Sequence, residues 1–155
     1  MEITLLLMDC DGVLTDGRLY FSAAGETMKV FDVRDGQGIV LWHRAGFKSG
    51  IISGRGAQEI VQSRSDELGI EFVRTGSVNK IEDFESIISS LEIGPEQVAY
   101  IGDDIGDIEL MKLVGFPVAV ADAGEKTKAV AKYITEAKGG RGAVREVIDM
   151  LLAIE

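Results

Sequence analysis

Short apolar runs recur along the chain and limit what it can fold into. Each run has the length of a strand, and several of the segments between them carry the spacing of a helix instead. Strands that alternate with helices favour a parallel sheet with helices on both faces, joined by right-handed connections. The predicted strands are Leu5–Met8, Gly50–Ile52, Glu71–Val73, Val98–Ile101 and Val118–Val120.

Helical spacing marks two connecting segments and the end of the chain. Ala57 to Leu68 and Ile81 to Leu91 each bring apolar residues near one face, and both end near a glycine or a turn. The last helix is expected to pack on the core through Val144, Val147, Ile148, Leu151 and Leu152. With 155 residues, 46% of them hydrophobic, the chain (1–155) is expected to form a single α/β domain with a three-layer, Rossmann-like fold.

One region breaks the alternation of strands and helices. Leu19 to Val33, "LYFSAAGETMKVFDV", contains two β-prone runs around a small turn with a glycine, which predicts a β-hairpin projecting after the first strand. Such a hairpin would leave Tyr20, Phe21 and Val30 partly exposed. Exposed apolar strand pairs are typical of subunit interfaces, so the hairpin is expected to contact another copy of the chain.

Charge and cysteine content exclude several kinds of partner and site. A formal net charge of -10 argues against nucleic acid and anionic membranes, since both require a basic face. Cys10 is the only cysteine, so a disulfide framework and a thiolate zinc cluster are excluded, and a cytoplasmic location is expected. His43 is the only histidine and cannot by itself anchor an imidazole metal site. The apolar run at Ile3 to Met8 is too short to span a membrane.

Polar residues gather where the predicted strands end. In parallel α/β sheets, ligands bind at the carboxyl ends of the strands, so residues that follow different strands meet at one edge. Taken alone, each group has an ordinary explanation as a turn, a helix cap or a surface residue, but their joint occurrence favours a site. The groups are Asp9 and Asp11 after the first strand, Ser53, Gly54 and Arg55 after the second, Lys80 at the start of a helix, and Asp103, Asp104 and Asp107 after the fourth strand.

The carboxylates of this set favour a hard cation and phosphoryl chemistry. Without His or Cys ligands, Mg²⁺ is the expected cation, and Asp9 and Asp103 can ligate it together. One carboxylate can then attack phosphorus and form an aspartyl-phosphate, while Asp11 protonates the leaving alkoxide and later activates water. Ser53 and neighbouring backbone N–H groups would hold the phosphoryl oxygens, and Lys80 would neutralise their charge.

Four segments resemble the signature motifs of the haloacid dehalogenase superfamily of phosphatases: "DCDGVLTDG", "IISGR", Lys80 and "GDDIGD". Further segments, "VFDVRDGQGI", "VAVADA" and "KGGRGAVREVIDMLL", are similar to the 3-deoxy-D-manno-octulosonate 8-phosphate phosphatases over nearly the whole chain. The resemblance implies a small phosphatase without an inserted cap domain, active in lipopolysaccharide biosynthesis. It also implies a homotetramer in which neighbouring subunits help to close each active site.

The resemblance also assigns roles to individual residues. It implies Asp9 as nucleophile and metal ligand, Asp11 as general acid/base and metal ligand through its carbonyl, and Asp103 as the third protein ligand. Ser53 and Lys80 would bind the phosphoryl group. Asp104 and Asp107 would orient Lys80 or metal-bound water, and Arg141 would reach a neighbouring subunit's site. The residues implied for binding the sugar acid phosphate are Asp11, Asp32, Val33, Arg34, Asp35, Gly36, Gly54, Arg55, Arg64, Lys80 and Arg141.

Three alternatives remain open at this point. The substrate could be a nine-carbon keto-deoxy acid 9-phosphate, although Arg55 favours the eight-carbon substrate. A phosphoacceptor receiver domain also combines clustered acids, a Ser/Thr and a Lys on a parallel sheet. Receivers, however, place the acid pair after the first strand and the phosphorylated Asp after the third, an order that this chain does not follow. A non-catalytic binding homologue would not need the complete polar set that this chain carries.

Overall fold

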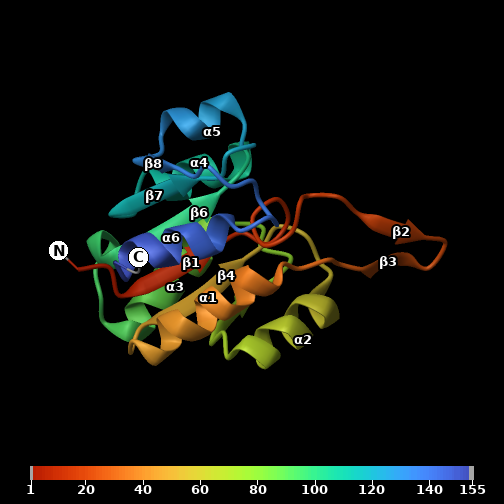
Figure 1. Cartoon of the computed structure of the whole chain (residues 1–155), viewed down its shortest axis with the longest axis horizontal. Coiled ribbons are helices and arrows are strands. Elements are labelled where there is room, and N and C mark those ends of the chain that lie inside the picture. The colour runs from red at the N-terminus through yellow and green to blue at the C-terminus, as the bar shows by residue number, and fades with distance from the viewer. Residues whose placement is uncertain (1, 154–155) are drawn as a thin grey trace.

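The computed structural model describes residues 2–153, and its centre is a six-stranded parallel sheet (Figure 1). The strands lie in the order β5-β4-β1-β6-β7-β8, so β1 is in the middle between β4 and β6. This confirms the predicted fold class. The bounds are β1 (Leu5–Met8), β4 (Lys48–Ile52), β5 (Phe72–Arg74), β6 (Val98–Gly102), β7 (Phe116–Ala119) and β8 (Tyr133–Ile134).

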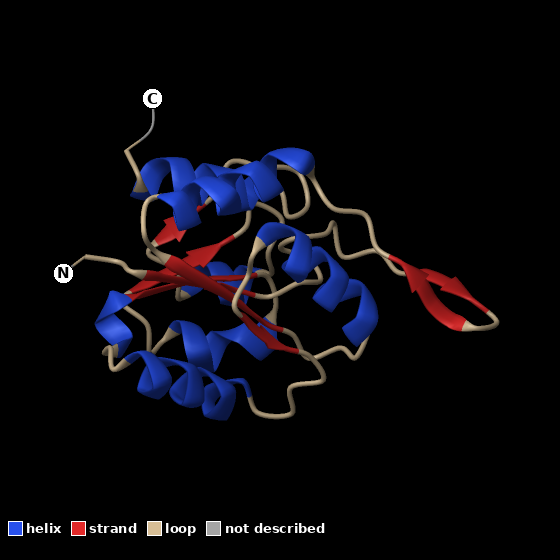
Figure 2. Cartoon of the chain, turned by 90° about the horizontal axis from the view of Figure 1, so that it is seen from below, coloured by secondary structure: helices blue, strands red, loops and turns tan. Residues whose placement is uncertain are grey.

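Helices cover both faces of the sheet (Figure 2). Helix α1 packs on α6, and α3 packs on α4. None of the helices within residues 2–153 is both long enough and apolar enough to cross a bilayer. The helices are α1 (Val33–Arg44), α2 (Gln58–Leu68), α3 (Lys80–Leu91), α4 (Ile108–Met111), α5 (Glu125–Ala129) and α6 (Ala143–Leu151), with short 3-10 turns η1 (Pro95–Gln97) and η2 (Ile105–Asp107).

Strand β1 forms the middle of the core. Its four residues are fully buried, as expected for a continuous apolar run that is covered on both faces. Strand β8 was not predicted, because a two-residue strand is too short to show a period. The central position of β1 places its carboxyl end beside the ends of β4 and β6, where the predicted site residues follow.

The predicted hairpin is present and projects away from the body of the molecule (Figures 1 and 2). Its antiparallel strands are β2 (Tyr20–Ser22) and β3 (Gly25–Met28), and the side chain of Phe21 is 70% exposed. The hairpin ends earlier than predicted because the side chain of Asp32 accepts hydrogen bonds from the N–H groups of Arg34 and Asp35. These bonds cap α1, so Val33 is the first residue of a helix.

Asp35, one of the residues predicted to bind substrate, ties α1 to α6. Its side chain is only 1% exposed, and Oδ1 accepts a hydrogen bond of 3.0 Å from the backbone N–H of Arg145 in the first turn of α6. The N-cap of α6 is Gly142, which has no side chain, so Asp35 supplies the cap from another helix. The side chain of Asp35 is thus engaged as a cap, and its role in substrate binding stays a prediction. Gly36 is buried as well, with the guanidinium of Arg64 packed against its Cα.

The cap predicts opposite effects for two substitutions of Asp35. Asp35→Ala removes the acceptor and should lower the free energy of unfolding by about 1 kcal/mol. Burial raises the pKa of Asp35 to about 6, so its charge destabilises the folded state as pH rises between about 4 and about 6. Asp35→Asn keeps an acceptor oxygen without the charge, and should equal or exceed the parent at pH 8.

Urea unfolding at pH 5 and pH 8 measures both effects, with Asp66→Asn on the exposed face of α2 as the control for loss of one charge. Asp35→Asn should be more stable than Asp35→Ala at both pH values, and its gain over the parent at pH 8 should exceed any change that Asp66→Asn causes. Equal stability of the two variants at both pH values would contradict the capping role.

Candidate active site

The ends of β1, β4 and β6 and the start of α3 enclose a pocket of about 360 Å³. The residues predicted to carry the chemistry all lie in its wall, although they are spread over almost 100 positions of the chain. This follows from the parallel sheet, in which neighbouring strands end at the same edge. The lining residues are Asp9, Asp11, Gly17, Ser53, Gly54, Arg55, Lys80, Asp103, Asp104, Gly106 and Asp107.

Three carboxylates in this pocket form a candidate cation site. Asp9, Asp103 and Asp107 each offer an oxygen, and these oxygens all lie within 4.8 Å of one another. Burial and the charge of Asp107 raise the pKa of Asp9 to about 6, and burial and the charge of Asp9 raise the pKa of Asp103 to about 8. A divalent cation would relieve this repulsion, so an all-oxygen site of this kind fits Mg²⁺.

Asp107 is already engaged by other groups of the protein. Its Oδ1 accepts hydrogen bonds from Lys80 Nζ at 2.7 Å and from the hydroxyl of Tyr100, and its Oδ2 accepts one of 3.0 Å from the N–H of Asp103. These bonds and the Lys80 charge hold the pKa of Asp107 below its usual value despite burial. Asp9 and Asp103 are therefore the side chains available to a cation, while Asp107 orients Lys80.

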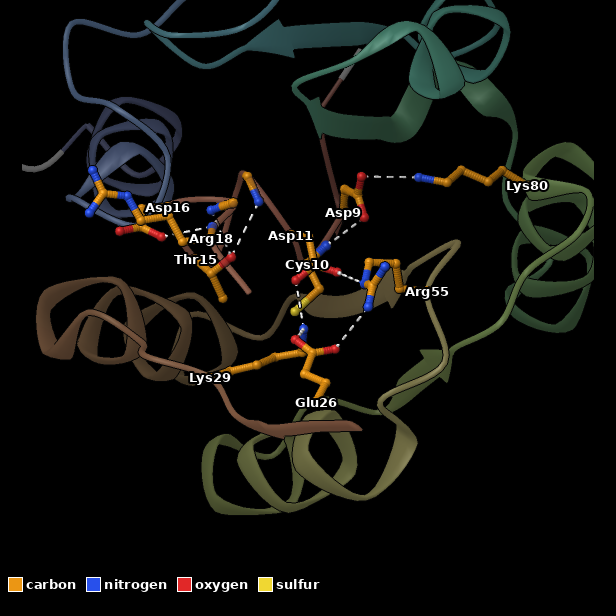
Figure 3. Close-up of polar contacts among 12 residues, drawn as sticks. Asp9, Cys10, Asp11, Thr15, Asp16, Arg18, Glu26, Lys29, Arg55 and Lys80 are labelled. Atoms are coloured by element: carbon orange, nitrogen blue, oxygen red, sulfur yellow. Dashed lines mark hydrogen bonds and ion pairs between the residues drawn. The ribbon is translucent and has the colours of Figure 1, made fainter. Parts of the chain in front are cut away.

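Lys80 lies between Asp107 and the predicted nucleophile. Its Nζ is 3.2 Å from Asp9 Oδ2 (Figure 3), and the two carboxylates keep its pKa above the usual value although burial opposes the charge. Asp104, predicted to share the orienting role, accepts a bond of 2.7 Å from the N–H of Ile105 and caps η2. Of the two acids, Asp107 is thus the one that the structure places on Lys80.

The loop after β1 is held by close backbone contacts. Gly12 has φ +88°, and a Cβ there would lie 1.9 Å from Asp103 Oδ2, so glycine is required for the carboxylate of Asp103 to approach. Gly139 approaches this loop from the C-terminal side, and a Cβ on it would lie 1.7 Å from the carbonyl oxygen of Gly12. Gly140 adds a hydrogen bond of 2.9 Å to the carbonyl of Val13. Gly139 and Gly140 therefore support the nucleophile loop of their own chain.

Ser53 is fixed at the end of β4. Its N–H donates to the carbonyl of Arg74 at 2.8 Å, and its carbonyl accepts from the N–H of Ser77 at 2.9 Å. Its own N–H is thus engaged, which leaves the hydroxyl as the group that Ser53 can offer to a phosphoryl oxygen. The rest of the predicted phosphate contact must come from backbone N–H groups that follow Ser53 in the turn.

The structure divides the residues implied for sugar binding among three places. Gly54 and Arg55 line the pocket that contains Asp9. Val33 and Arg64 line a neighbouring pocket of about 650 Å³, where Arg64 pairs with Glu67 and lies over the ring of Phe31. A third pocket of about 480 Å³ is lined by residues that include Asp32, Val33, Arg34 and Arg141.

Sequence analysis missed two charged residues beside Asp11. Lys29 Nζ lies 2.6 Å from Asp11 Oδ1 and 2.9 Å from Glu26 Oε2, and Arg55 lies 3.7 Å from Asp11 Oδ2 (Figure 3). The bonds to Asp11 and Glu26 keep the pKa of Lys29 above its usual value although burial opposes the charge. In the sequence, both residues belong to a hairpin that is predicted to project from the body of the protein, and no spacing rule connects them to Asp11.

Two further side chains of reactive type, those of Cys10 and His43, have no catalytic role. Burial, and then the charge of Asp11, raises the pKa of Cys10 to about 12, so its thiol is not a nucleophile. His43 pairs through Nε2 with the hydroxyl of Ser49 at 2.6 Å, and burial lowers its pKa. Neither side chain therefore takes part in the chemistry of the pocket.

Known proteins of similar sequence are sugar acid phosphatases. The chain is 47% identical over 151 residues to the 3-deoxy-D-manno-octulosonate 8-phosphate phosphatase of Escherichia coli K12, covering 97% of this chain and 80% of that protein. The phosphatase of the same name from Yersinia pestis is 45% identical over the same share of both chains.

Solved structures agree with these relatives. The crystal structure of the Yersinia pestis phosphatase matches with a TM-score of 0.94 and 44% identity, covering 97% of this chain and 81% of that one. The phosphatase of Moraxella catarrhalis, solved with a magnesium ion, a phosphate ion and a KDO molecule, matches with a TM-score of 0.93 and 38% identity, covering 97% and 86%.

A family model described as haloacid dehalogenase-like hydrolase matches residues 45–148, which include the segments of Ser53, Lys80 and Asp103. The match begins after the nucleophile loop, but the relatives align over nearly the whole chain, Asp9 included. Family model, relatives and pocket agree, and this chain belongs to the haloacid dehalogenase-like hydrolases.

Proposed function

We propose that this protein is a Mg²⁺-dependent phosphatase that hydrolyses 3-deoxy-D-manno-octulosonate 8-phosphate through an aspartyl-phosphate on Asp9. The observation that carries the proposal is the convergence of Asp9, Asp11, Ser53, Lys80 and Asp103 in one pocket. The relatives act on this sugar acid phosphate by name, and one was solved with magnesium, phosphate and KDO. Receiver domains are not favoured, because the matching family and relatives are hydrolases.

The residues of the pocket divide the reaction into two steps. In the first, a carboxylate oxygen of Asp9 attacks phosphorus, the bond from phosphorus to the sugar oxygen breaks, and Asp11 donates a proton to that oxygen. In the second, Asp11 takes a proton from water, the water oxygen attacks phosphorus, and the carboxylate of Asp9 leaves. Lys80 and the hydroxyl of Ser53 bind the phosphoryl oxygens throughout.

The cation would be held by Asp9 and Asp103, with the carbonyl of Asp11 as the further ligand that the family resemblance implies. Mg²⁺ bound there supplies positive charge that offsets the negative charge of phosphate and carboxylates. Asp107 keeps Lys80 directed at Asp9, since Lys80 bonds to both carboxylates. For substrate binding, Arg55 lines the same pocket and its planar guanidinium suits a carboxylate.

Phosphate release from a panel of sugar acid phosphates with Mg²⁺ tests the substrate. The eight-carbon 8-phosphate should give the highest kcat/KM, and the nine-carbon keto-deoxy acid 9-phosphates should be turned over less efficiently. A higher kcat/KM for a nine-carbon substrate would reject the substrate assignment but keep the phosphatase. An aspartyl-phosphate that persists after substrate removal would favour the receiver alternative.

The assembly that we propose is a homotetramer built on the hairpin. The hairpin projects from the body and exposes five large apolar side chains at or near its strands: Leu19, Tyr20, Phe21, Met28 and Val30. A monomer would leave this surface in water, which soluble monomers rarely do over a contiguous patch. Arg141 of one subunit is proposed to reach a neighbour's site, and the buried thiol of Cys10 fits the reducing cytoplasm.

Phe21→Asp is expected to dissociate the assembly, because it places a charge where an apolar side chain is 70% exposed. Light scattering should give a tetramer for the parent and a smaller species for the variant, with an unchanged far-UV circular dichroism spectrum. Ser89→Asp, on the exposed face of α3, is the matched control and should remain a tetramer. A parent protein that is a clean monomer would refute the hairpin interface.

A further inference from the structure

The hairpin contributes an ion-pair network to the active site. Lys29, just after β3, and Glu26, within β3, form alternating charges with Asp11 and Arg55 (Figure 3). We propose that Lys29 is a positioning residue that fixes the carboxylate of Asp11, so that Asp11 Oδ2 is the atom that transfers the proton. This proposal rests on the proposed phosphatase function, in which Asp11 is the general acid and base.

The two oxygens of Asp11 have different surroundings. Oδ1 accepts a hydrogen bond of 2.6 Å from Lys29 Nζ. Oδ2 is buried and has no hydrogen-bond partner among the described residues, and Arg55 Nε lies 3.7 Å from it. A buried acceptor without a partner is uncommon unless a ligand or proton completes it. Oδ2 is therefore the oxygen available to the leaving group. The neighbouring side chain of Arg55 is 46% exposed.

Lys29 is itself buried and paired with two carboxylates. Its side chain is 2% exposed, and Glu26 binds it at 2.9 Å while also pairing with Arg55 at 3.4 Å. Lysine side chains are almost never this buried unless they are paired. A buried ion pair is also an inefficient way to stabilise a hairpin, because desolvation offsets most of the attraction. We infer that burial and the pairing with Glu26 hold Lys29 in place for its hydrogen bond to the carboxylate of Asp11.

Fixing Asp11 matters for the proton transfers. In the first step the proton on Oδ2 passes to the sugar oxygen as the electron pair of the breaking phosphorus–oxygen bond moves onto that oxygen. In the second step Oδ2 takes a proton from water. If Asp11 rotates, neither transfer has the required geometry, and general acid–base catalysis is worth about 10²- to 10⁴-fold. A poor alkoxide leaving group depends on the first transfer, whereas p-nitrophenolate departs without a proton.

Lys29→Met tests the proposal because methionine preserves the length of the side chain and removes its donor. We expect kcat/KM for the sugar acid phosphate to fall about 100-fold. For p-nitrophenyl phosphate, kcat/KM should fall less than about 3-fold, since kcat/KM reports only the steps up to loss of the leaving group. Lys48→Met, which removes a lysine paired with Glu71 at the opposite end of β4, should leave both values unchanged.

The results that would overturn the role of Lys29 differ from those that would reject the proposed substrate. Equal losses for both substrates, or no loss for either, would overturn the positioning role of Lys29. A parent that hydrolyses p-nitrophenyl phosphate but not the sugar acid phosphate would reject the proposed substrate, and another alkyl phosphate that the parent hydrolyses would then serve in the comparison. A crystal structure of Lys29→Met tests the proposal without any activity measurement. Asp11 should adopt another side-chain orientation in this variant, and an unchanged orientation would overturn the proposal even if the variant is inactive.

Discussion

Asp9→Asn is expected to abolish turnover and to leave the fold intact. The amide cannot attack phosphorus and is a poorer cation ligand, so the rate of phosphate release should fall by about 10⁴- to 10⁶-fold, as for other covalent nucleophiles. The substitution should not lower the stability of the folded state. Burial and the charge of Asp107 already disfavour a carboxylate at this position and raise the pKa of Asp9 to about 6. Without Mg²⁺ at pH 8, the melting temperature of the variant should equal or exceed that of the parent.

Two measurements separate the nucleophile from a general loss of charge. Phosphate release is followed at saturating Mg²⁺ and substrate, and thermal unfolding is followed in EDTA. Asp16→Asn is the matched control in the same loop. Within residues 2–153, the only hydrogen bond to the Asp16 side chain comes from the nearby N–H of Arg18, and Asp16 lies outside the pocket lining. Phosphate release by Asp9→Asn at a rate similar to the parent would reject the aspartyl-phosphate mechanism.

Removal of Mg²⁺, or Asp103→Asn, is expected to have the second largest effect. Charge stabilisation by a cation at a phosphoryl group is worth several kcal/mol, so activity should fall on the order of 10³-fold. Mg²⁺ at 100 times its dissociation constant should stabilise the parent by about 2.7 kcal/mol, which raises the melting temperature by about 5–10 °C. Asp103→Asn should lose most of this stabilisation, whereas Asp66→Asn on α2 should keep it.

The effect of Mg²⁺ should also depend on pH. Burial and the charge of Asp9 raise the pKa of Asp103 to about 8, well above the unfolded value of about 4. In EDTA, the contribution of this group to the free energy of unfolding is therefore greatest below about pH 4 and is lost as pH rises towards about 8. Mg²⁺ needs the ionised carboxylate, so the stabilisation that it adds should be larger at pH 8 than at pH 5.5. Equal stabilisation at both pH values would contradict the carboxylate cation site.

Sequence patterns predicted the parts of the site that depend on strand ends. The short apolar run Leu5–Met8 predicts a buried strand, so the acids directly after it are expected at its carboxyl end. Ser53 and Asp103 follow two other strands in the same way, and β4 and β6 proved to be the two neighbours of β1. Periodicity located these elements because burial on a sheet or a helix leaves a regular pattern in the chain.

Contacts between distant residues left no such pattern. The cap of α6 joins Asp35 to Arg145, 110 positions away, and no local pattern around Asp35 predicts this bond. Lys29 likewise reads as part of an exposed hairpin, and the approach of Gly139 to Gly12 joins opposite ends of the chain. Each of these contacts exists only after the sheet has brought the segments together.

The amino-acid sequence by itself determined the strand and helix pattern, the edge of the sheet at which the acids meet, and the choice of oxygen ligands for a cation. Tertiary structure alone decided which oxygens are free to act: Asp107 is occupied by Lys80 and Tyr100, and Asp11 is held at Oδ1 by Lys29. The physical reason is that secondary structure follows from local periodicity, whereas hydrogen-bond occupancy depends on side chains that folding brings within about 3 Å.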